Sequence, residues 1–118
     1  MMNADPNCIF CKIIAGTIPA KTVHEDDHVV VIQDLDPKAP HHLLLIPRKH
    51  IVNCLDIAEE DRDLIGHIHM VAAKLARERG VAESGFRIVT NTNADAGQSV
   101  FHIHFHLLAG RNFAWPPG

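Results

Sequence analysis

Near the end of the chain, three histidines alternate with apolar residues, and this pattern restricts the local fold more than any other. The segment reads His102-Ile103-His104-Phe105-His106-Leu107. Side chains alternate between the two faces of a β-strand, so the three imidazoles share one face and the apolar residues share the other. On a helix, where each residue turns by about 100°, the first two histidines would lie about 200° apart. The pattern therefore predicts a strand over residues 100–108 with one histidine-lined face.

The rest of the chain predicts an α+β fold. Runs of β-branched and apolar residues predict strands at 22–25, 28–34, 42–46 and 86–91. Apolar residues at helical spacing predict a short helix at 8–15 and a long one at 56–80. We expect the long helix to begin at a capping box of Asp56 and Glu59, and residues 93–97 to form a polar loop. Successive strands with short turns favour an antiparallel meander covered on one face by the long helix.

Length and charge limit the size of the protein and its partners. The 118 residues fit a single domain over 1–118, with residues 1–7 frayed and residues 109–118 forming an irregular tail. A formal charge of −3 gives no basic stripe, so we expect no nucleic-acid partner. The longest apolar run, at 43–46, is far shorter than the roughly 20 residues of a membrane span. The first ten residues carry no secretory signal, so a cytoplasmic location is expected.

Three imidazoles on one strand face have three interpretations. They can be structural residues, they can hold a metal such as zinc, or they can act on a phosphate. Neutral imidazole attacks phosphorus, and a neighbouring imidazole can deliver a proton. The preceding loop adds Gly97 and Ser99, which could offer donors to phosphoryl oxygens or could simply form a turn. The residues alone favour function over structure and leave metal binding and phosphate chemistry both open.

A second candidate site lies near the start of the chain, where Cys8 and Cys11 form a C-x-x-C pair. Three cysteines in a chain without an export signal argue against a disulfide framework. Two thiolates at this spacing supply half of a zinc site. They can equally be small apolar residues on one face of the first helix. The sequence leaves these two interpretations balanced.

From its motifs, the chain is identified as a member of the histidine triad (HIT) family. The family pattern alternates three histidines with apolar residues and ends in two apolar residues, and 102–108 matches it in full. The resemblance also covers CIFCKIIAG and IPA near the start, Asp34, HLLLIPRKH at 42–50, and GQSVFHIHFHLLAGRNFAWPPG at 97–118. The last stretch is similar to the Hint branch, the histidine triad nucleotide-binding proteins. The match therefore runs almost from end to end.

The resemblance implies a fold and a reaction. The family fold is a five-stranded antiparallel sheet with one short N-terminal helix and one long helix, and two subunits join their sheets in a homodimer. Hint-branch enzymes hydrolyse purine nucleoside phosphoramidates, such as AMP-NH2 and AMP-lysine, and release AMP or GMP. The resemblance makes His104 the nucleophile, which forms a nucleotidylated histidine that water then hydrolyses.

The resemblance also assigns roles residue by residue. It places His42, His102 and His106 with His104 in the catalytic group, and Asp34 on the ribose hydroxyls. It places Asn91, Gly97 and Ser99 against the phosphate or leaving group. The apolar slot for the purine matches Ile9, Phe10, Ile13, Ile18, Ile32 and Leu35.

The resemblance also has implications for cofactors and metals. The chemistry requires no cofactor. Some bacterial relatives hold a structural zinc with a cysteine pair and two histidines, which match Cys8, Cys11, His50 and His102.

Three rival functions remain from the sequence. One is a different HIT reaction, the hydrolysis of dinucleoside polyphosphates or nucleotidyl transfer. Another is a non-enzymatic nucleotide-binding dimer, in which the histidines only hold phosphate. The third is a zinc-binding module in which the triad itself holds the metal.

Overall fold

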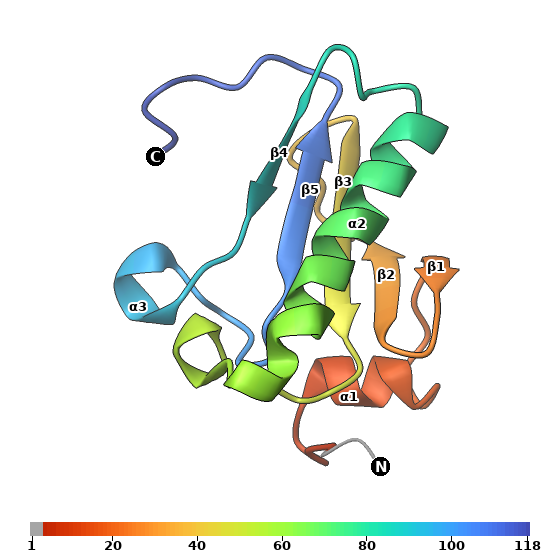
Figure 1. Ribbon diagram of the computed structural model, residues 1–118, viewed down its shortest axis with the longest axis vertical. Coiled ribbons are helices and arrows are strands. Elements are labelled where there is room, and N and C mark those ends of the chain that lie inside the picture. Colours follow the sequence, from red (N-terminus) through yellow and green to blue (C-terminus); the bar gives the residue numbers. More distant parts are fainter. Residues whose placement is uncertain (1–3) are drawn as a thin grey trace.

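The computed structural model describes residues 4–118 and shows one five-stranded sheet with a helix on each face (Figure 1). The strands are β1 (Thr22–Glu25), β2 (Val29–Gln33), β3 (His41–Pro47), β4 (Phe86–Val89) and β5 (Phe105–Ala109). The helices are α1 (Ile9–Ile14), the long α2 (Arg62–Glu78) and a single turn, α3 (Asn93–Ala96). Two 3₁₀ turns, at Cys54–Asp56 and Glu59–Asp61, precede α2. The predicted α+β class is confirmed. No helix within residues 4–118 is long and apolar enough to cross a membrane.

All strand pairs are antiparallel, but the predicted meander holds only for the first three strands. The order is β1-β2-β3-β5-β4, so the last strand inserts between β3 and β4. His42 pairs with Leu108, and Leu44 pairs with His106, across the β3–β5 register. This insertion places two histidine-bearing strands side by side at the centre of the sheet.

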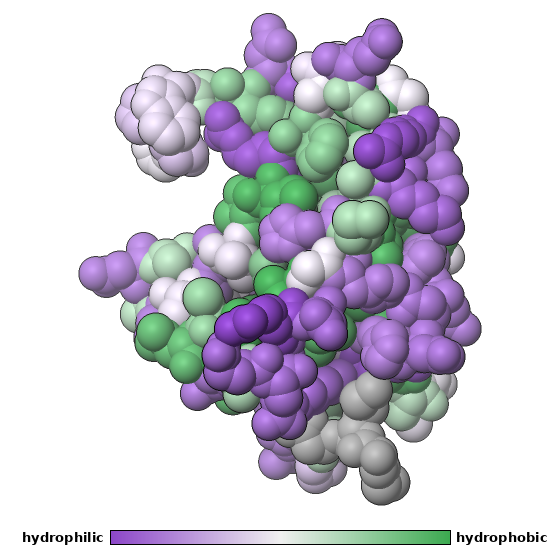
Figure 2. All heavy atoms as spheres, viewed as in Figure 1, coloured by the Kyte–Doolittle hydropathy of each residue, from purple (hydrophilic) through white to green (hydrophobic). Residues whose placement is uncertain are grey.

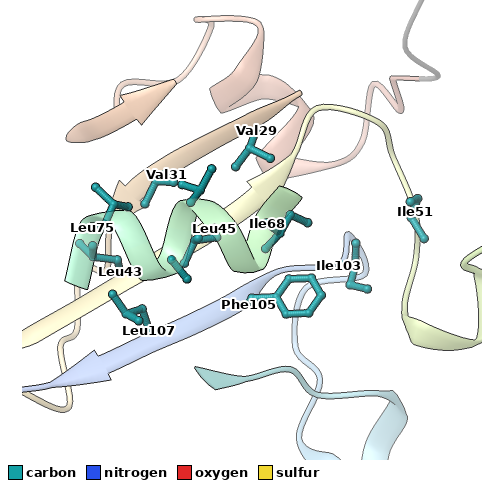
Figure 3. Packing of buried hydrophobic residues seen from close by; sticks show 12 residues of the cluster. Val29, Val31, Leu43, Leu45, Ile51, Ile68, Leu75, Ile103, Phe105 and Leu107 are labelled. Carbon is teal, nitrogen blue, oxygen red and sulfur yellow. The ribbon is translucent and has the colours of Figure 1, made fainter. Parts of the chain in front are cut away.

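The sheet separates two cores, because successive residues on a strand face opposite sides. The face under α2 packs apolar residues from four elements, as Figure 3 shows: Val29, Val31, Leu43, Leu45, Ile68, Leu75, Phe105 and Leu107. The other face packs Val30, Ile32, Leu44 and Ile46 against α1 and its N-cap residue, which contribute Phe10, Cys11 and Cys8. His42 and His106 share this second face, in register with the α1 core.

Several predicted boundaries are wrong for reasons of tertiary contact. The long helix begins at Arg62 rather than at residue 56. Asp56 and Glu59 do not form its cap. The residue before the helix is Asp61, which makes no side-chain cap bond, and its carboxylate accepts hydrogen bonds from the Ala58 N–H and from Lys49 Nζ. The predicted loop at 93–97 contains α3, which Gly97 ends with a positive φ of 84°.

Residues 4–7 and the tail after β5 lie at the two ends of the part of the chain that the structure describes. Residues 1–3 of the segment expected to fray lie outside the described residues. Residues 4–7 form a turn, in which Asn7 N–H donates to the Asp5 carboxylate and Cys8 N–H donates to the Asp5 carbonyl. The tail after β5 has no helix or strand, and it projects from the sheet on the β4 side (Figure 1).

Candidate active site

The predicted strand over 100–108 is shorter in the structure, yet its alternation of side chains persists. The ladder begins at Phe105, so His102 and His104 precede β5 instead of lying within it. Ile103 and Phe105 still join the core under α2. The three histidines face the opposite side, where Phe10 of α1 contacts the rings of His102 and His104 edge-on at centroid distances of 5.9 and 5.0 Å. The sorting of imidazoles from apolar residues is therefore confirmed.

The surroundings of His104 determine which of its ring nitrogens carries the proton. Its Nδ1 lies 2.8 Å from the carbonyl oxygen of His102. A carbonyl only accepts hydrogen bonds, so Nδ1 must hold the proton and Nε2 must hold the lone pair. Burial lowers the pKa of His104, against the hydrogen bond to the His102 carbonyl and the charge of Asp34, which raise it. His104 is thus a neutral imidazole with a nucleophilic Nε2 at pH 7.

A chain of hydrogen bonds gives His106 the opposite arrangement. The Lys38 N–H donates to His42 Nδ1 at 3.0 Å, so the proton of a neutral His42 lies on Nε2. His42 Nε2 lies 2.9 Å from His106 Nδ1, which must therefore accept. The proton of a neutral His106 then lies on Nε2. Burial, followed by the neighbouring charges of His104 and His42, lowers the pKa of His106 to about 4, so the neutral form prevails at pH 7.

Two adjacent imidazoles thus present different Nε2 atoms to their surroundings. The rings of His104 and His106 have centroids 5.2 Å apart. One offers a lone pair and the other offers an N–H donor. A nucleophile beside a donor is the pair needed to attack an electrophilic centre while stabilising the group that leaves it.

Asp34 lies beside this pair and serves both interpretations considered from the sequence. Its Oδ1 accepts the N–H of Asp36 at 2.8 Å, as a turn-forming aspartate does. Its Oδ2 lies 3.3 Å from His42 Nε2. Burial lowers the pKa of His42, and the Asp34 charge works against that shift. The carboxylate therefore supports the histidine chain and borders the space in front of it.

His102 is directed away from the other two histidines. Its Nε2 donates to the Pro47 carbonyl at 2.8 Å, so its lone pair lies on Nδ1. That nitrogen lies 3.3 Å from Cys8 Sγ and 3.1 Å from His50 Nδ1. The ring is fully buried, at 0% exposure, and burial lowers its pKa to about 4. Both ring nitrogens of His102 are engaged outside the His104–His106 pair.

Two groups of side chains within residues 4–118 bring metal-type donors within 4.8 Å of one another. The first is Cys8, Cys11, His50 and His102, which combines two thiols with two imidazoles, a donor set typical of structural zinc. His102 turns its lone pair into this group, and its other nitrogen is held by a carbonyl, the second-shell arrangement common for zinc ligands. The donor set fits zinc.

The second group, Asp34, His42 and His106, does not fit a metal. The Lys38 N–H can only donate, so it keeps the lone pair of His42 on Nδ1 and the proton on Nε2. Nε2 is the nitrogen that faces the other two donors. A neutral imidazole ligates through its lone pair, so His42 would have to lose the bond to Lys38 before it could ligate a metal there.

Comparisons with known proteins identify the family. A family model described as "Scavenger mRNA decapping enzyme C-term binding" matches residues 7–113. The purine nucleoside phosphoramidase of Escherichia coli strain K12 is 46% identical over 103 residues, which are 87% of each chain. The chain belongs to the histidine triad (HIT) family.

Solved HIT structures share this fold closely. A HIT family hydrolase from Legionella pneumophila superposes with a TM-score of 0.93 at 49% identity, covering 95% of this chain and 100% of its own. A histidine triad protein from Clostridium difficile gives a TM-score of 0.90 at 44% identity, covering 93% and 96%. Relatives named as hydrolases support an enzymatic function in general for this HIT protein.

The remaining predicted site residues of this HIT protein fall into three places. Phe10, Ile32 and Ile13 pack in the core between α1 and the sheet. Leu35, next to Asp34, is 97% exposed, and Ile9 is 47% exposed. Ile18 lines a hollow beside the end of α1. Of the predicted apolar set, two residues are therefore buried, two are half-buried and two are exposed.

The predicted phosphate contacts lie on both sides of α3. Asn91 lines a cavity of about 530 Å³ together with His42 and His106. Ser99 lines a smaller hollow beside Cys8 and His50. Gly97 is exposed at the end of α3. Figure 2 shows a hollow on this side of the molecule, between the projecting C-terminal tail and the α3 region.

Sequence reasoning missed several groups around the histidine clusters, among them the Lys38 N–H, the Pro47 carbonyl and Arg111. The first two are backbone groups, which carry no sequence signal. The Arg111 Nε donates to the Lys38 carbonyl at 2.9 Å, and Arg111 lies within the tail predicted to be irregular. Only its place in the family-like C-terminal stretch could have drawn attention to it.

Proposed function

We propose that this protein is a hydrolase that cleaves the P–N bond of purine nucleoside phosphoramidates through a nucleotidylated His104. The observation that carries the proposal is the opposite proton placement on two neighbouring imidazoles. A phosphoramidate has a poor leaving group until its nitrogen is protonated. The reaction therefore needs a neutral nucleophile and a separate proton donor within reach of the same phosphorus.

In the first step, His104 Nε2 attacks the α-phosphorus and the P–N bond breaks. The electron pair of that bond moves to the leaving nitrogen, which takes a proton from Nε2 of His106. The anionic substrate favours a once-protonated His42–His106 pair, beside the Asp34 carboxylate, as the source of this proton. Giving up the proton leaves a neutral pair in which Nε2 of His106 carries a lone pair, ready to accept a proton in the second step.

In the second step, a water molecule attacks the phosphorus of the nucleotidylated His104. The proton of the water passes to Nε2 of His106, the N–P bond breaks, and the nucleoside monophosphate leaves. His104 returns to the neutral form with its proton on Nδ1, where the His102 carbonyl accepts it. Both steps use the same two nitrogens, because the donor of the first step becomes the acceptor of the second.

The nucleotide is proposed to lie with its ribose at Asp34 and its phosphate toward Asn91, Gly97 and Ser99. Both Asp34 oxygens retain acceptor capacity for the ribose hydroxyls. The exposed Leu35 and Ile9 would lose contact with water against a purine ring, which favours binding by about 25 cal/mol per Å² of apolar surface.

The test is a rapid acid quench of the wild-type protein with adenosine 5′-phosphoramidate. We expect a covalent adenylate on His104, found by peptide mass spectrometry, and steady release of AMP. Diadenosine polyphosphates are expected to react far more slowly. Faster turnover of those compounds would instead indicate a dinucleoside polyphosphate hydrolase, transfer of the adenylate to added phosphate would indicate a nucleotidyl transferase, and binding without turnover would indicate a nucleotide-binding protein.

We also propose a structural zinc held by Cys8, Cys11, His50 and His102. The metal would join α1 to the segment that leads into β5 and to the residues that follow β3. His102 would then serve this cluster, while its carbonyl oxygen orients His104. The zinc would supply stability, and the proposed chemistry does not pass through it.

A cytoplasmic homodimer is the proposed form of the protein. Among the strands described, β4 pairs only with β5, so its outer edge can extend the sheet. Sedimentation is expected to give twice the chain mass of 13.1 kDa, and amide exchange should show protection along β4. A monomeric mass at micromolar concentration would contradict the dimer.

A further inference from the structure

The tail that follows β5 lies directly against the loop before β3. Gly110 has a φ of 97°, and a Cβ built there would lie 2.8 Å from Cβ of Pro40 and 3.2 Å from Cδ2 of His41. Real Cβ atoms do not approach so closely, so only glycine allows this contact. The position after it, Arg111, is thereby placed beside the loop at residues 36–40.

Arg111 is held in a fixed position by three contacts. Its Nε donates to the Lys38 carbonyl at 2.9 Å, and its Nη1 donates to the Asn112 carbonyl at 2.9 Å. Its guanidinium carbon also lies 4.3 Å from the centre of the Phe113 ring. A planar guanidinium with a stacked face and two directed N–H groups fixes the carbonyl that it binds.

Lys38 connects this tail contact to the histidine chain. Its carbonyl accepts from Arg111, while its N–H donates to His42 Nδ1 at 3.0 Å. Lys38 is exposed, and its side chain forms an ion pair with Asp36, which is also exposed. The orientation of its backbone therefore depends on the two hydrogen bonds at its N–H and its carbonyl.

If the Lys38 N–H moves away, the histidine chain can reverse. His42 can then carry its proton on Nδ1 and turn a lone pair toward His106. His106 must respond by donating from Nδ1, because two lone pairs would otherwise meet at 2.9 Å. Its Nε2, which faces the space in front of His104, then holds a lone pair in place of a proton.

We propose that Arg111 is a positioning residue, which holds Lys38 against His42 and so keeps the proton of His106 on Nε2. Its importance for turnover rests on the proposed function, in which that nitrogen serves the leaving group. Its effect on the proton position does not, because that follows from the hydrogen bonds alone.

The experiment records long-range proton–nitrogen NMR spectra of the histidine side chains at neutral pH. Protonated and unprotonated nitrogens of a neutral imidazole resonate far apart, so the spectra report each tautomer directly. In the wild type we expect a proton on Nε2 of both His42 and His106. In Arg111→Gln and in Arg111→Lys we expect both residues to give intermediate shifts, because two tautomers exchange.

Two controls separate position from charge. Arg111→Lys keeps the positive charge but loses the planar fork, so an effect of charge alone would leave its spectra like those of the wild type. Arg87 also lies over the Phe113 ring, at 5.3 Å, but donates to the Ala114 carbonyl and not to Lys38. Arg87→Gln is therefore expected to keep the wild-type tautomers.

With adenosine 5′-phosphoramidate, both Arg111 variants are expected to lose about tenfold in kcat while KM changes by less than about twofold. Wild-type tautomers in Arg111→Gln, or tautomers that change only when the charge is removed, would overturn the proposal. A wild type that fails to turn over the substrate but shows the expected tautomers and their loss would overturn the proposed function and leave the positioning role intact.

Discussion

Two histidine clusters lie on the same face of the sheet, only a few residues apart in sequence, and they are built for different chemistry. In the cluster with Cys8 and Cys11, His102 turns a lone pair on Nδ1 toward two thiols and a second imidazole. In the cluster with Asp34 and His42, the imidazoles form a hydrogen-bonded chain. Both are candidate metal sites by composition and distance.

The two clusters differ in the backbone group that binds the ring nitrogen directed away from the cluster, in His102 and in His42. The Pro47 carbonyl accepts a hydrogen bond from Nε2 of His102, so the lone pair of His102 lies on Nδ1 and faces the cluster. The Lys38 N–H donates a hydrogen bond to Nδ1 of His42, so the proton of His42 lies on Nε2 and faces the cluster. Ligand type and distance are therefore insufficient to recognise a metal site, because the tautomer decides whether an imidazole can ligate.

The largest expected effect tests the His104 side of the comparison. His104→Ala removes the nucleophile, so hydrolysis of adenosine 5′-phosphoramidate should fall by about 10⁴-fold or more. AMP binding, measured by calorimetry, should remain. The matched control is His69→Ala on α2, whose Nδ1 contacts the Ile65 carbonyl of its own helix, and it should keep wild-type turnover. Near-normal turnover in His104→Ala would remove the mechanism.

The next effect tests the donor that the histidine chain creates. His106→Ala should lower kcat for the phosphoramidate by about 10²-fold, the usual contribution of a general acid. The loss should be much smaller for an adenosine 5′-phosphate ester of nitrophenol, because that leaving group departs without a proton. Equal losses on the two substrates would show that His106 does not protonate the leaving group.

A smaller effect, on the free energy of unfolding, tests the cluster with Cys8 and Cys11 as a zinc site. Untagged protein should contain close to one equivalent of zinc by elemental analysis, and Cys8→Ser or Cys11→Ser should lose it. Zinc present at about 100 times its Kd contributes about 2.7 kcal/mol to the free energy of unfolding, so urea unfolding should show a loss of that order. Turnover should change by less than about threefold, because the metal takes no part in the steps.

The exposed Cys54 lies outside the zinc cluster, so Cys54→Ser is the matched control and should keep the metal. Less than about a tenth of an equivalent of zinc in the wild type would contradict the metal site.

The smallest effect concerns a third group of histidines, which surrounds a carboxylate. Burial raises the pKa of Asp26, but hydrogen bonds from His24, from His67 and from the N–H groups of His28 and Val29 outweigh it and hold that pKa well below its usual range. A depressed carboxyl pKa stabilises the fold above the unfolded pKa of about 3.9, and this stabilisation is lost as the pH falls toward the folded pKa.

Asp26→Asn should therefore reduce the free energy of unfolding by about 1–2 kcal/mol at pH 6–8. The difference in free energy of unfolding between the variant and the wild type should become smaller below about pH 4, as urea unfolding at several pH values would show. Zinc content and turnover should not change, because Asp26 contacts neither cluster. A gap that is constant down to pH 3 would show that the carboxylate charge is not the stabilising feature.

Local patterns predicted most of the elements, and their failures occur where distant residues intervene. The predicted strands at 22–25 and 42–46 match β1 and β3, and the two main helices also follow from periodicity and composition. The predicted start of α2 was wrong because a 3₁₀ turn at Glu59–Asp61 precedes the helix, and Lys49, from the segment after β3, pairs with Asp61 at 2.6 Å. The strand order was wrong because a meander is only the shortest connection, and β5 pairs with β3 instead.

The site shows the same division. The resemblance placed His42 with His106, and the structure brings their nitrogens to 2.9 Å. The same resemblance placed His102 in two groups, among the catalytic residues and among the metal ligands. The structure directs its ring nitrogens to the Pro47 carbonyl and the cysteine cluster, and brings only its carbonyl to His104.

The sequence by itself determined which side chains share a face, because alternation along an extended segment is a property of neighbouring residues. It therefore determined that imidazoles separate from apolar residues over 102–107 and that two thiols lie one helical turn apart. The tertiary structure decided where the protons of His102 and His106 lie, since the partners that fix those two rings are 55 and 64 positions away. A tautomer depends on one directed hydrogen bond, and only the folded chain brings that donor or acceptor into place.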